Sequence, residues 1–344
     1  MKVAVDAQLA VGTATGIGEY VRGLIGGLHA HGVGVAVLKQ PALDPWRFDR
    51  RVLWDQILLP VAFKKSGASL LHCTAGTMPF LLAGPAVVTV HDVAWLRAQE
   101  HTRFYARFYF GAFSLARYRQ ARQIVVDSEF SRSELLQVLH VSPARVRVVY
   151  PGVAEDYCKV VRLPDPEPFI LSVGTVETRK NLEVVIRALR DVPNPVRLVV
   201  AGPSTPYEDD CKQLAAEYGV ADRIVWRGYV ERELLLDLFA RAALLVMPSK
   251  YEGFGYGAAQ ALCAGVPLLV SDSSSLPEVV EGEALALPCD DVASWTAHIN
   301  AILNDRENAE RRAAAIRHGA ITRFAWRASI ARMCEVYEAA LKER

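Results

Sequence analysis

The feature that most constrains this chain is a regular alternation of short apolar runs with longer amphipathic stretches. Stretches with helical periodicity, such as 18–30 and 131–139, separate the runs. Short uninterrupted apolar runs are typical of parallel strands that are buried on both faces. The alternation therefore predicts a doubly wound α/β sheet. In the first half of the chain the expected strands are residues 3–5, 33–38, 69–72, 86–90, 123–126 and 145–149.

A proline-rich segment, residues 159–168, interrupts this pattern with Pro164, Pro166 and Pro168. Such a segment cannot continue a helix or a central strand, so it is predicted to be a linker. The alternation of apolar runs and amphipathic stretches then resumes. Strands are expected at 169–173, 196–201, 224–226, 243–247 and 267–271, and helices at 182–189, 209–218, 231–241, 257–263 and 292–303.

The length of 344 residues fits two domains of ordinary size. We expect residues 1–160 together with 326–344 to form the first domain, and residues 161–325 to form the second. The last helix is expected over 326–341, and its apolar face would pack on the first domain through Ile330, Met333, Val336 and Ala340. Two Rossmann-like domains joined by a hinge would face each other across a cleft, where ligands of such folds bind.

Net charge and cysteine usage exclude some classes of protein. A formal net charge of +1 argues against a dedicated nucleic-acid-binding protein. Residues 1–160 nevertheless carry 18 basic and 12 acidic residues. This half would therefore meet an anionic surface or acceptor, unless the excess is ordinary scatter. The six cysteines form no CxxC pair, as expected of a protein in a reducing compartment. With no signal peptide and no long apolar run, the chain is predicted to be cytoplasmic.

A glycine-rich stretch with Gly12, Gly16 and Gly18 lies between the first expected strand and its helix. Glycines there let backbone N–H groups approach a phosphate, although a tight strand-to-helix turn explains them too. A nicotinamide dinucleotide site would also require an acid at the end of the second strand. That strand ends in Leu38, Lys39 and Gln40, so an NAD-dependent oxidoreductase is unlikely on this pattern.

Polar and cationic side chains follow two further strands. His91 and Asp92 come directly after the run 86–90, where an imidazole could donate to a sugar hydroxyl or a phosphate oxygen; a structural histidine is the alternative. Arg179 and Lys180 follow the first strand of the second half. Fixed cations of this kind suit a diphosphate and stabilise it most as it leaves, although a solvated basic pair is also possible.

The strongest local signal is the stretch 248–260, which follows an expected strand and opens a helix. Its three glycines leave several backbone N–H groups free for hydroxyl or phosphate oxygens. Its acid can accept hydrogen bonds from sugar hydroxyls, and an amide one to two turns into the helix can face the same pocket. These residues are Glu252, Gly253, Gly255, Gly257 and Gln260.

Together these motifs resemble family 4 of the retaining glycosyltransferases, which have the GT-B fold. The resemblance runs along nearly the whole chain. Its motifs are the glycines at 16–18, the pair at 91–92, and the runs 127–132, 150–153, 173–182, 252–255 and 275–278. Arginine, lysine and asparagine at 179–181 are similar to a bacterial branch rich in mannosyltransferases of polysaccharide assembly. That similarity favours GDP-mannose as the donor, with UDP sugars as the alternative.

The resemblance also implies roles for individual residues. Arg179 and Lys180 would bind the donor diphosphate, with Gly16 and Gly18 near the phosphates. Glu252 and the backbone of Gly253, Phe254 and Gly255 would contact the transferred sugar, which His91 would approach from the other domain. Thr175, Gly228 and Val230 would complete the donor site. Such enzymes typically need no metal and no cofactor, and cations can replace Mg²⁺.

Two positions depart from the family's pattern. A second acid usually follows Glu252 by eight positions and holds the ribose, whereas this chain has the neutral Gln260, a weaker acceptor. An arginine often follows the glycine of the phosphate strand, whereas this chain has Thr175. Arg179 and Lys180 must therefore carry the positive charge.

The segment 102–122 interleaves aromatic residues with arginines. A basic, aromatic amphipathic helix can lie on an anionic membrane, which would suit a lipid-linked acceptor at the inner membrane face. A core helix with a cationic outer face is the alternative.

These observations favour an enzyme that moves a hexose from a nucleoside-diphosphate sugar to a glycan or lipid-linked acceptor, with retention. A catalytically weak sugar-nucleotide-binding protein is the alternative, because of Gln260. A GT-B epimerase or phosphorylase fits less well, since a glycogen-type phosphorylase would need a pyridoxal-binding lysine and a much longer chain.

Overall fold

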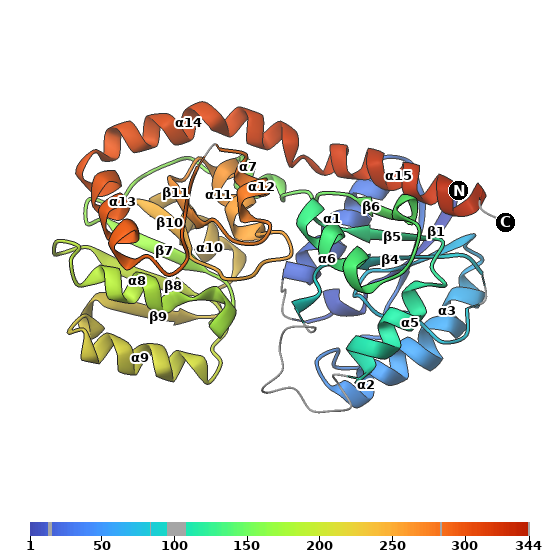
Figure 1. Cartoon of the computed structure of the whole chain (residues 1–344). Coiled ribbons are helices and arrows are strands. Elements are labelled where there is room, and N and C mark those ends of the chain that lie inside the picture. The colour runs from blue at the N-terminus through green and yellow to red at the C-terminus, as the bar shows by residue number, and fades with distance from the viewer. Residues whose placement is uncertain (13–15, 83, 95–107, 283, 343–344) are drawn as a thin grey trace. The chain divides into compact units, whose positions relative to one another are not determined.

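The computed structural model describes residues 1–344 except 13–15, 83, 95–107, 283 and 343–344 (Figure 1). The chain forms two compact units, each with its own sheet and core. Unit 1 comprises Met1–Ala154 and Ala325–Arg344, and unit 2 comprises Glu155–Phe324. The domain boundaries expected from the sequence lie at 160/161 and 325/326.

Unit 1 is a six-stranded, parallel sheet with the order β2-β1-β3-β4-β5-β6. Its strands are β1 Lys2–Asp6, β2 Gly34–Leu38, β3 Leu70–Cys73, β4 Ala86–Val90, β5 Gln123–Val126 and β6 Val146–Val148. Its α-helices are α1 Gly16–Ala30, α2 Phe48–Leu53, α3 Leu59–Ser66, α5 Ser114–Tyr118, α6 Glu129–Val138 and α15 Trp326–Lys342. Its other helical segments are the 3₁₀ helices η1 Gln8–Ala10 and η5 Pro143–Arg145 and the π-helices η2 Trp54–Leu58 and η4 Tyr109–Phe113.

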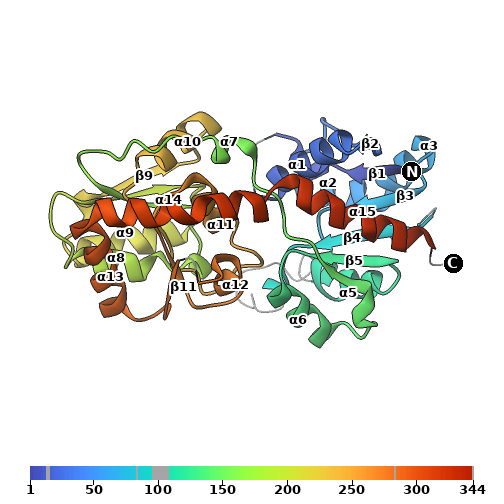
Figure 2. The ribbon, with the colours of Figure 1, turned by 90° about the horizontal axis from the view of Figure 1, so that it is seen from above.

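Helices cover both faces of this sheet, because successive strand side chains point to opposite sides. Val3 and Val5 of β1 pack with α1 and α15, whereas Ala4 between them packs with α3, α5 and α6 on the other face. α15 belongs to unit 1 and lies along α1, as its apolar spacing predicts (Figure 2).

Close contact between α1 and α15 depends on glycines of α1. A Cβ atom on Gly23 would lie 2.1 Å from the ring of Trp326, and one on Gly27 would lie 2.6 Å from Ile330. The side chains at both positions must therefore be absent for the two helices to pack at this distance.

Unit 2 repeats the architecture, with the parallel strand order β12-β11-β10-β7-β8-β9. Its strands are β7 Phe169–Val173, β8 Arg197–Ala201, β9 Ile224–Gly228, β10 Leu244–Met247, β11 Leu268–Ser271 and β12 Leu285–Leu287. Its α-helices are α7 Glu155–Cys158, α8 Leu182–Leu189, α9 Tyr207–Glu217, α10 Arg232–Arg241, α11 Tyr256–Ala264, α12 Leu276–Val280, α13 Val292–Asn304 and α14 Arg306–Arg323. The 3₁₀ turns are η6 Thr178–Lys180 and η7 Ala221–Arg223. The core on one face lies between the sheet and α8, α9 and α13.

The proline-rich segment 159–168 is not the hinge that its composition predicts. The chain enters unit 2 earlier, between Ala154 and Glu155. Arg162 donates to the carbonyls of Phe239, Ala240 and Ala242 and pairs with Glu310 at 2.5 Å. Prolines prevent regular structure here, but the extended backbone and this guanidinium still bind the end of α10.

The predicted fold class is confirmed, since both halves are doubly wound α/β units with parallel six-stranded sheets. Among the described residues, no helix is long and apolar enough to cross a bilayer.

Candidate active site

The geometry of unit 2 places two loops at one edge of its sheet. The strand order places β7 between β10 and β8, so the direction of winding reverses between β7 and β10. Ligands of open α/β sheets bind outside the carboxyl ends of the strands at such a switch point. The loop after β7 carries Arg179 and Lys180, and the loop after β10 carries Glu252.

Glu252, Arg179 and Lys180 form one ion cluster. The Glu252 Oε1 atom accepts from Lys180 Nζ at 2.5 Å and from Ser249 Oγ at 2.7 Å. Its Oε2 atom accepts from Arg179 Nη1 at 2.9 Å. A carboxylate has about four lone-pair sites, so these three hydrogen bonds leave capacity for one further donor. Arg179 Nη2 also lies 2.7 Å from Glu177 Oε1, an ion pair that is about one-third exposed.

Glu252 is buried, at 5% exposure, yet its charge is compensated. Burial by itself would raise the pKa of this carboxyl, but Lys180 and Arg179 outweigh that effect and lower it below its ordinary value. The residue is therefore an ionised acceptor at neutral pH, and it holds both cations in fixed positions.

Backbone contacts join the two loops. Lys250 N donates to Arg179 O at 2.8 Å, and Arg179 Nη1 donates to Tyr251 O at 3.1 Å. Asn181 adopts a left-handed conformation with φ 53°, and its amide donates to Pro248 O at 3.1 Å and Cys289 O at 2.7 Å. Asparagine tolerates this conformation better than most residues. Asn181 therefore joins the loop after β7 to the loop after β10.

Serines beyond β11 hold the main chain of Glu252. Glu252 N donates to Ser274 Oγ at 2.9 Å, and Ser275 Oγ donates to Glu252 O at 3.0 Å. These serines and Ser249 are site residues that the motif analysis did not single out. Ser275 lies in the run 275–278, which is part of the family resemblance, but the sequence did not indicate its hydrogen bond to Glu252.

Gly255 ends the loop at the start of α11. Its φ of 89° lies in the left-handed region, and a Cβ there would meet Leu276 Cδ2 at 2.5 Å. Phe254 is buried against the ring of Phe324, with 5.8 Å between ring centroids. Glycine at 255 is therefore required twice, by conformation and by packing. Gly253 precedes Phe254 and is also buried.

Glycines also bring the ends of β7, β8 and β9 together. A Cβ on Gly202 would overlap Gly174 O at 1.9 Å, and Gly202 N donates to Gly228 O at 2.8 Å. Thr175 and Val230 are half-buried beside these glycines in sequence. These contacts give Gly228 a structural role, and the donor contacts predicted for Thr175, Gly228 and Val230 stay predictions.

His91 lies in unit 1 at the carboxyl end of β4. Its Nδ1 atom is 2.6 Å from Asp127 Oδ2, beyond the neighbouring strand β5, and its Nε2 atom is 2.9 Å from Thr74 O. Both partners are acceptors, so only the doubly protonated ring donates to both. Burial lowers the pKa of His91, but Asp127 outweighs it and the net pKa is raised. Asp127 is the partner that the sequence did not reveal, although it also ends a buried strand.

The glycines after β1 differ from one another. Gly18 is buried in the first turn of α1, where a Cβ would lie 3.0 Å from Leu9 O. Gly16 is exposed and has no atom within 4 Å of its Cβ position. Gly18 is therefore explained by packing. The phosphate contact predicted for both residues stays a prediction, and residues 13–15 lie outside the described part.

A buried ion cluster lies at the switch point of unit 1, where β1 is flanked by β2 and β3. Arg51 Nε donates to Asp55 Oδ2 at 2.9 Å, and its Nη2 lies 3.6 Å from Asp6 Oδ2 and donates to Thr77 Oγ1 at 2.6 Å. Tyr109 also donates to Asp55. These contacts bind the loop after β3, and the sequence analysis did not predict them.

Two family models match the chain. Residues 154–319 match the model for glycosyl transferases group 1, and residues 14–157 match the model for glycosyltransferase family 4. The chain belongs to the family 4-like glycosyltransferases.

Curated relatives agree with this assignment. An O-antigen chain mannosyltransferase B of Escherichia coli is 31% identical over 238 residues, which are 64% of this chain and 61% of that protein. The match thus spans only about three fifths of that relative. Among solved structures, a sucrose-phosphate synthase from Thermosynechococcus elongatus has a TM-score of 0.78 at 22% identity and covers 98% of both chains. The Anabaena protein HepE, in complex with UDP-glucose, has a TM-score of 0.75 at 16% identity and covers 98% of this chain.

Gln260 stands where this glycosyltransferase family usually has a second acid. It lies in α11 and is 6% exposed, and its amide has no hydrogen-bond partner among the described residues. The ribose contact predicted for this amide stays a prediction.

The segment 102–122 is not one amphipathic helix in its described part, and residues 95–107 are not described. η4 is kinked at Gly111, and α5 ends at Tyr118. Tyr109, Arg117 and Tyr118 are buried, and Arg117 donates to Pro79 O at 2.9 Å. These three buried side chains are therefore not available to a membrane surface.

Proposed function

We propose that this glycosyltransferase moves a hexose from a nucleoside-diphosphate sugar to a glycan or lipid-linked acceptor, with retention of anomeric configuration. The ion cluster of Glu252, Arg179 and Lys180 at the switch point of unit 2 carries the proposal. GDP-mannose is the favoured donor, supported by the mannosyltransferase relative. UDP sugars are the alternative, supported by the neighbour that binds UDP-glucose.

The proposed reaction follows from what these side chains can do. Arg179 can exchange its exposed partner Glu177 for a diphosphate oxygen, whereas Lys180 supplies a compact charge. Their positions are set before the donor arrives, so they stabilise the charge that develops on the leaving diphosphate. The free lone pair of Glu252 would accept a hydroxyl of the transferred sugar. The acceptor hydroxyl would attack from the same face, and the departing diphosphate would take its proton.

His91 is proposed to approach the transferred sugar as a cation. Both of its ring N–H groups are used within unit 1, so it would act through its charge and its carbon edge rather than through a free N–H group. This refines the prediction that the imidazole donates to the ligand.

A panel of UDP, GDP, ADP and CMP sugars tests donor binding, because a ligand that binds the native state raises the melting temperature. We expect one diphosphate sugar to raise it, and Lys180→Gln to remove most of that rise. Lys250→Gln is the matched control, because Lys250 is an exposed cation of the neighbouring loop after β10, 3.5 Å from Asp290. If no nucleotide shifts the melting temperature at millimolar concentration, the donor assignment is wrong.

Turnover distinguishes an enzyme from a sugar-nucleotide-binding protein. The enzyme should hydrolyse its donor slowly without acceptor, whereas a protein that binds nucleotide and never cleaves any donor would favour the binding alternative that Gln260 suggests.

No group of three or more His, Cys, Asp or Glu side chains in the described part could hold a metal. Metal independence stays a prediction, and undiminished turnover with a chelator would support it.

Peripheral membrane contact is proposed for unit 1, in a cytoplasmic protein. Unit 1 holds 21 basic and 13 acidic residues, a formal net charge of +8, against −7 for unit 2. A cavity of about 540 Å³ is lined by Arg119, Arg122 and Arg145 together with Gly84 and Pro85. Such a surface would attract anionic lipids.

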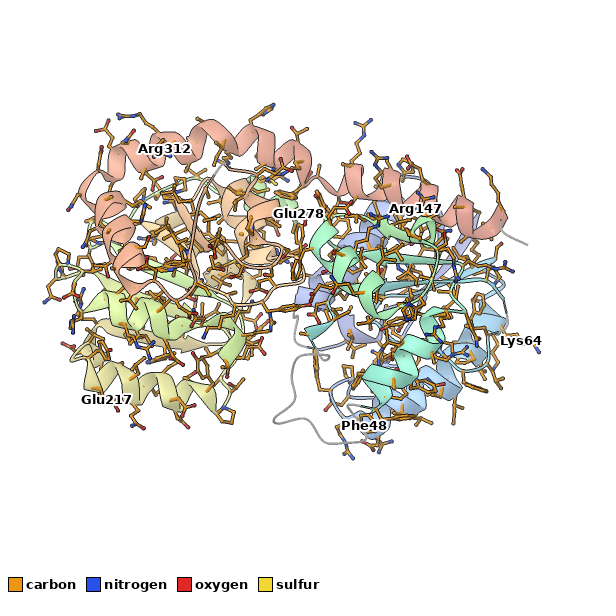
Figure 3. All side chains as sticks on the ribbon, in the orientation of Figure 1. Phe48, Lys64, Arg147, Glu217, Glu278 and Arg312 are labelled. Atoms are coloured by element: carbon orange, nitrogen blue, oxygen red, sulfur yellow. The ribbon has the colours of Figure 1, made fainter. Side chains whose placement is uncertain are left out.

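Other side chains of unit 1 are also available to a membrane. Phe80 and Leu81 are 62% and 72% exposed, and Lys64 projects from the outside of α3 (Figure 3). We expect the double variant Arg119→Glu/Arg122→Glu to lose co-sedimentation with phosphatidylglycerol vesicles. Arg312→Glu, on the outer side of α14, is the control and should bind as the wild type does (Figure 3). If both variants bind the vesicles equally well, the result favours the alternative, a core helix with a cationic outer face.

A further inference from the structure

Two of the six cysteines lie side by side in unit 2. Cys158 ends α7 and is half-buried, and Cys263 lies in α11 and is fully buried. Their thiols are within hydrogen-bonding distance of each other. Neither forms a disulfide in this structure, and nothing in the proposed transfer reaction uses them.

Arg317 holds the backbone of both cysteines. Its Nη2 atom donates to Cys158 O and Val160 O at 2.8 Å each, and its Nε atom donates to Cys263 O at 3.0 Å. One planar guanidinium on α14 therefore fixes the end of α7 against α11. The proximity of the two thiols is maintained by three hydrogen bonds that do not involve sulfur.

The two thiols differ in acidity. The hydrogen bond from Cys263 is the main cause that lowers the pKa of Cys158 to about 7; burial opposes it, and Arg317 adds to the lowering. The same hydrogen bond and burial raise the pKa of Cys263. Oxidation-sensitive cysteines combine thiolate character, solvent access and a neighbouring resolving thiol. Cys158 meets all three conditions, whereas burial raises the pKa of Cys73 and Cys211.

We propose that Cys158 and Cys263 form a redox-active pair, in which a peroxide oxidises Cys158 and Cys263 closes the disulfide. The Cys158 thiolate attacks one peroxide oxygen, the O–O bond breaks, and the other oxygen leaves as water after taking a proton. The resulting sulfenic acid is attacked by Cys263, whose proton leaves with the hydroxyl as a second water molecule. Two thiols and one hydrogen peroxide thus become one disulfide and two water molecules, and a dithiol reverses the change.

The location gives this bond a consequence. α7 begins at the residue where the chain enters unit 2, and α11 begins directly after Gly255 of the loop that carries Glu252. A disulfide would bind the entry point of unit 2 to the helix of the proposed donor site. It would also close a long chain loop, so we expect the oxidised protein to melt at a higher temperature.

Peptide mapping of the full-length protein tests the proposal. Reduced protein is treated with an equimolar amount of hydrogen peroxide, alkylated, digested and analysed without reduction. We expect a cross-linked peptide pair that contains Cys158 and Cys263, and its disappearance after treatment with a dithiol. Alkylated thiols at both positions, at a dose that oxidises Cys289, would overturn the proposal.

Single variants separate the two roles. Cys263→Ala should leave Cys158 as a sulfenic acid that a cyclic diketone traps, whereas Cys158→Ser should abolish both products. Cys289→Ser and Cys334→Ser are matched controls, since both residues are half-buried, as Cys158 is; the disulfide should form in both. Independent oxidation of Cys158 and Cys263 in the wild type, without a cross-link, would also contradict the assignment. The wild-type mapping does not depend on any variant folding.

Discussion

At the scale of single residues, the charge of Glu252 is the property on which the proposed donor site depends. Its carboxylate is buried and is stable only because Lys180 and Arg179 compensate it. The two cations remain partly exposed, at 21% and 33%, and can therefore still meet an anionic ligand. Burial of the acid with access to its partners is the arrangement expected of a preorganised anion site.

Glu252→Gln preserves shape but removes this charge. We expect about a 10²-fold loss of turnover and a destabilisation of about 1–2 kcal/mol, because two cations lose their shared partner. The folded-state pKa of Glu252 lies below its ordinary value, so its contribution to stability is present above that value and is lost as pH falls through the folded one. The difference in melting temperature between wild type and variant should therefore shrink between about pH 5 and 3. A constant difference would mean that Glu252 acts by packing alone.

For the pair of His91 and Asp127, the expected pH dependence of stability is opposite to that of Glu252. Asp127→Asn should lower the pKa of His91, since the carboxylate that favours the imidazolium is gone. The raised pKa makes the contribution of this pair fully present below the ordinary value of His91, and rising pH through the folded value removes it. Histidine NMR titration measures the shift. His72 is the internal control, because burial lowers its pKa to about 3 and it stays neutral throughout. An unshifted His91 titration would contradict the pairing.

At the scale of elements, the contact between α1 and α15 offers a matched test within one helix. Gly23→Ala should destabilise unit 1 by about 1–3 kcal/mol, because its Cβ would overlap the ring of Trp326. Gly26→Ala, three residues further on, meets no atom within 4 Å and should stabilise α1 by about 0.5–1 kcal/mol. Urea unfolding of both variants measures the difference. Equal effects of the two substitutions would show that α15 does not pack at this distance.

Helix α14 shows why some helices are not predicted from the sequence. Its eighteen residues, Arg306–Arg323, bury only Ala313 and Ala320. A helix that is polar on almost every side has no apolar stripe, and the stripe is the signal that predicts a helix. The usable signal was its start, where the side chain of Asp305 accepts from Asn308 N at 3.2 Å.

At the scale of the whole molecule, the two units differ in how the chain builds them. Unit 2 is one continuous stretch, whereas unit 1 is completed by residues 325–344. α15 supplies four large, buried side chains to the core of unit 1: Ile330, Met333, Val336 and Tyr337. At about 1.5–3 kcal/mol each, their burial is comparable to the whole stability of a domain.

A fragment of residues 1–154 should therefore fail to fold alone. We expect no cooperative thermal transition for it by circular dichroism, and recovery of one when a peptide of residues 325–344 is added. The complementary fragment 155–324 contains its own core and should melt cooperatively. A cooperative transition of the first fragment without the peptide would show that α15 only covers the unit and does not complete it.

The fold class and the positions of most strands follow from the sequence, because buried parallel strands need uninterrupted apolar runs. The sequence also indicates the loops of the proposed site, since Glu252, Arg179, Lys180 and His91 all follow such runs. The partners of these residues, by contrast, are set by tertiary contacts. Asp127 reaches His91 from the end of the neighbouring strand, and Ser274 and Ser275 reach Glu252 from beyond β11. Partners across parallel strands are far apart in sequence, so periodicity and spacing carry no record of them.

The placement of the proline-rich segment and of the aromatic segment was also decided by tertiary contacts. Arg162 binds the first to the end of α10, and the second is kinked at Gly111, with Tyr109 and Arg117 buried. Composition predicts what a segment cannot form, such as a helix interrupted by prolines. It does not predict which neighbouring carbonyls and rings the segment will meet, because these are brought near only when the two sheets have formed.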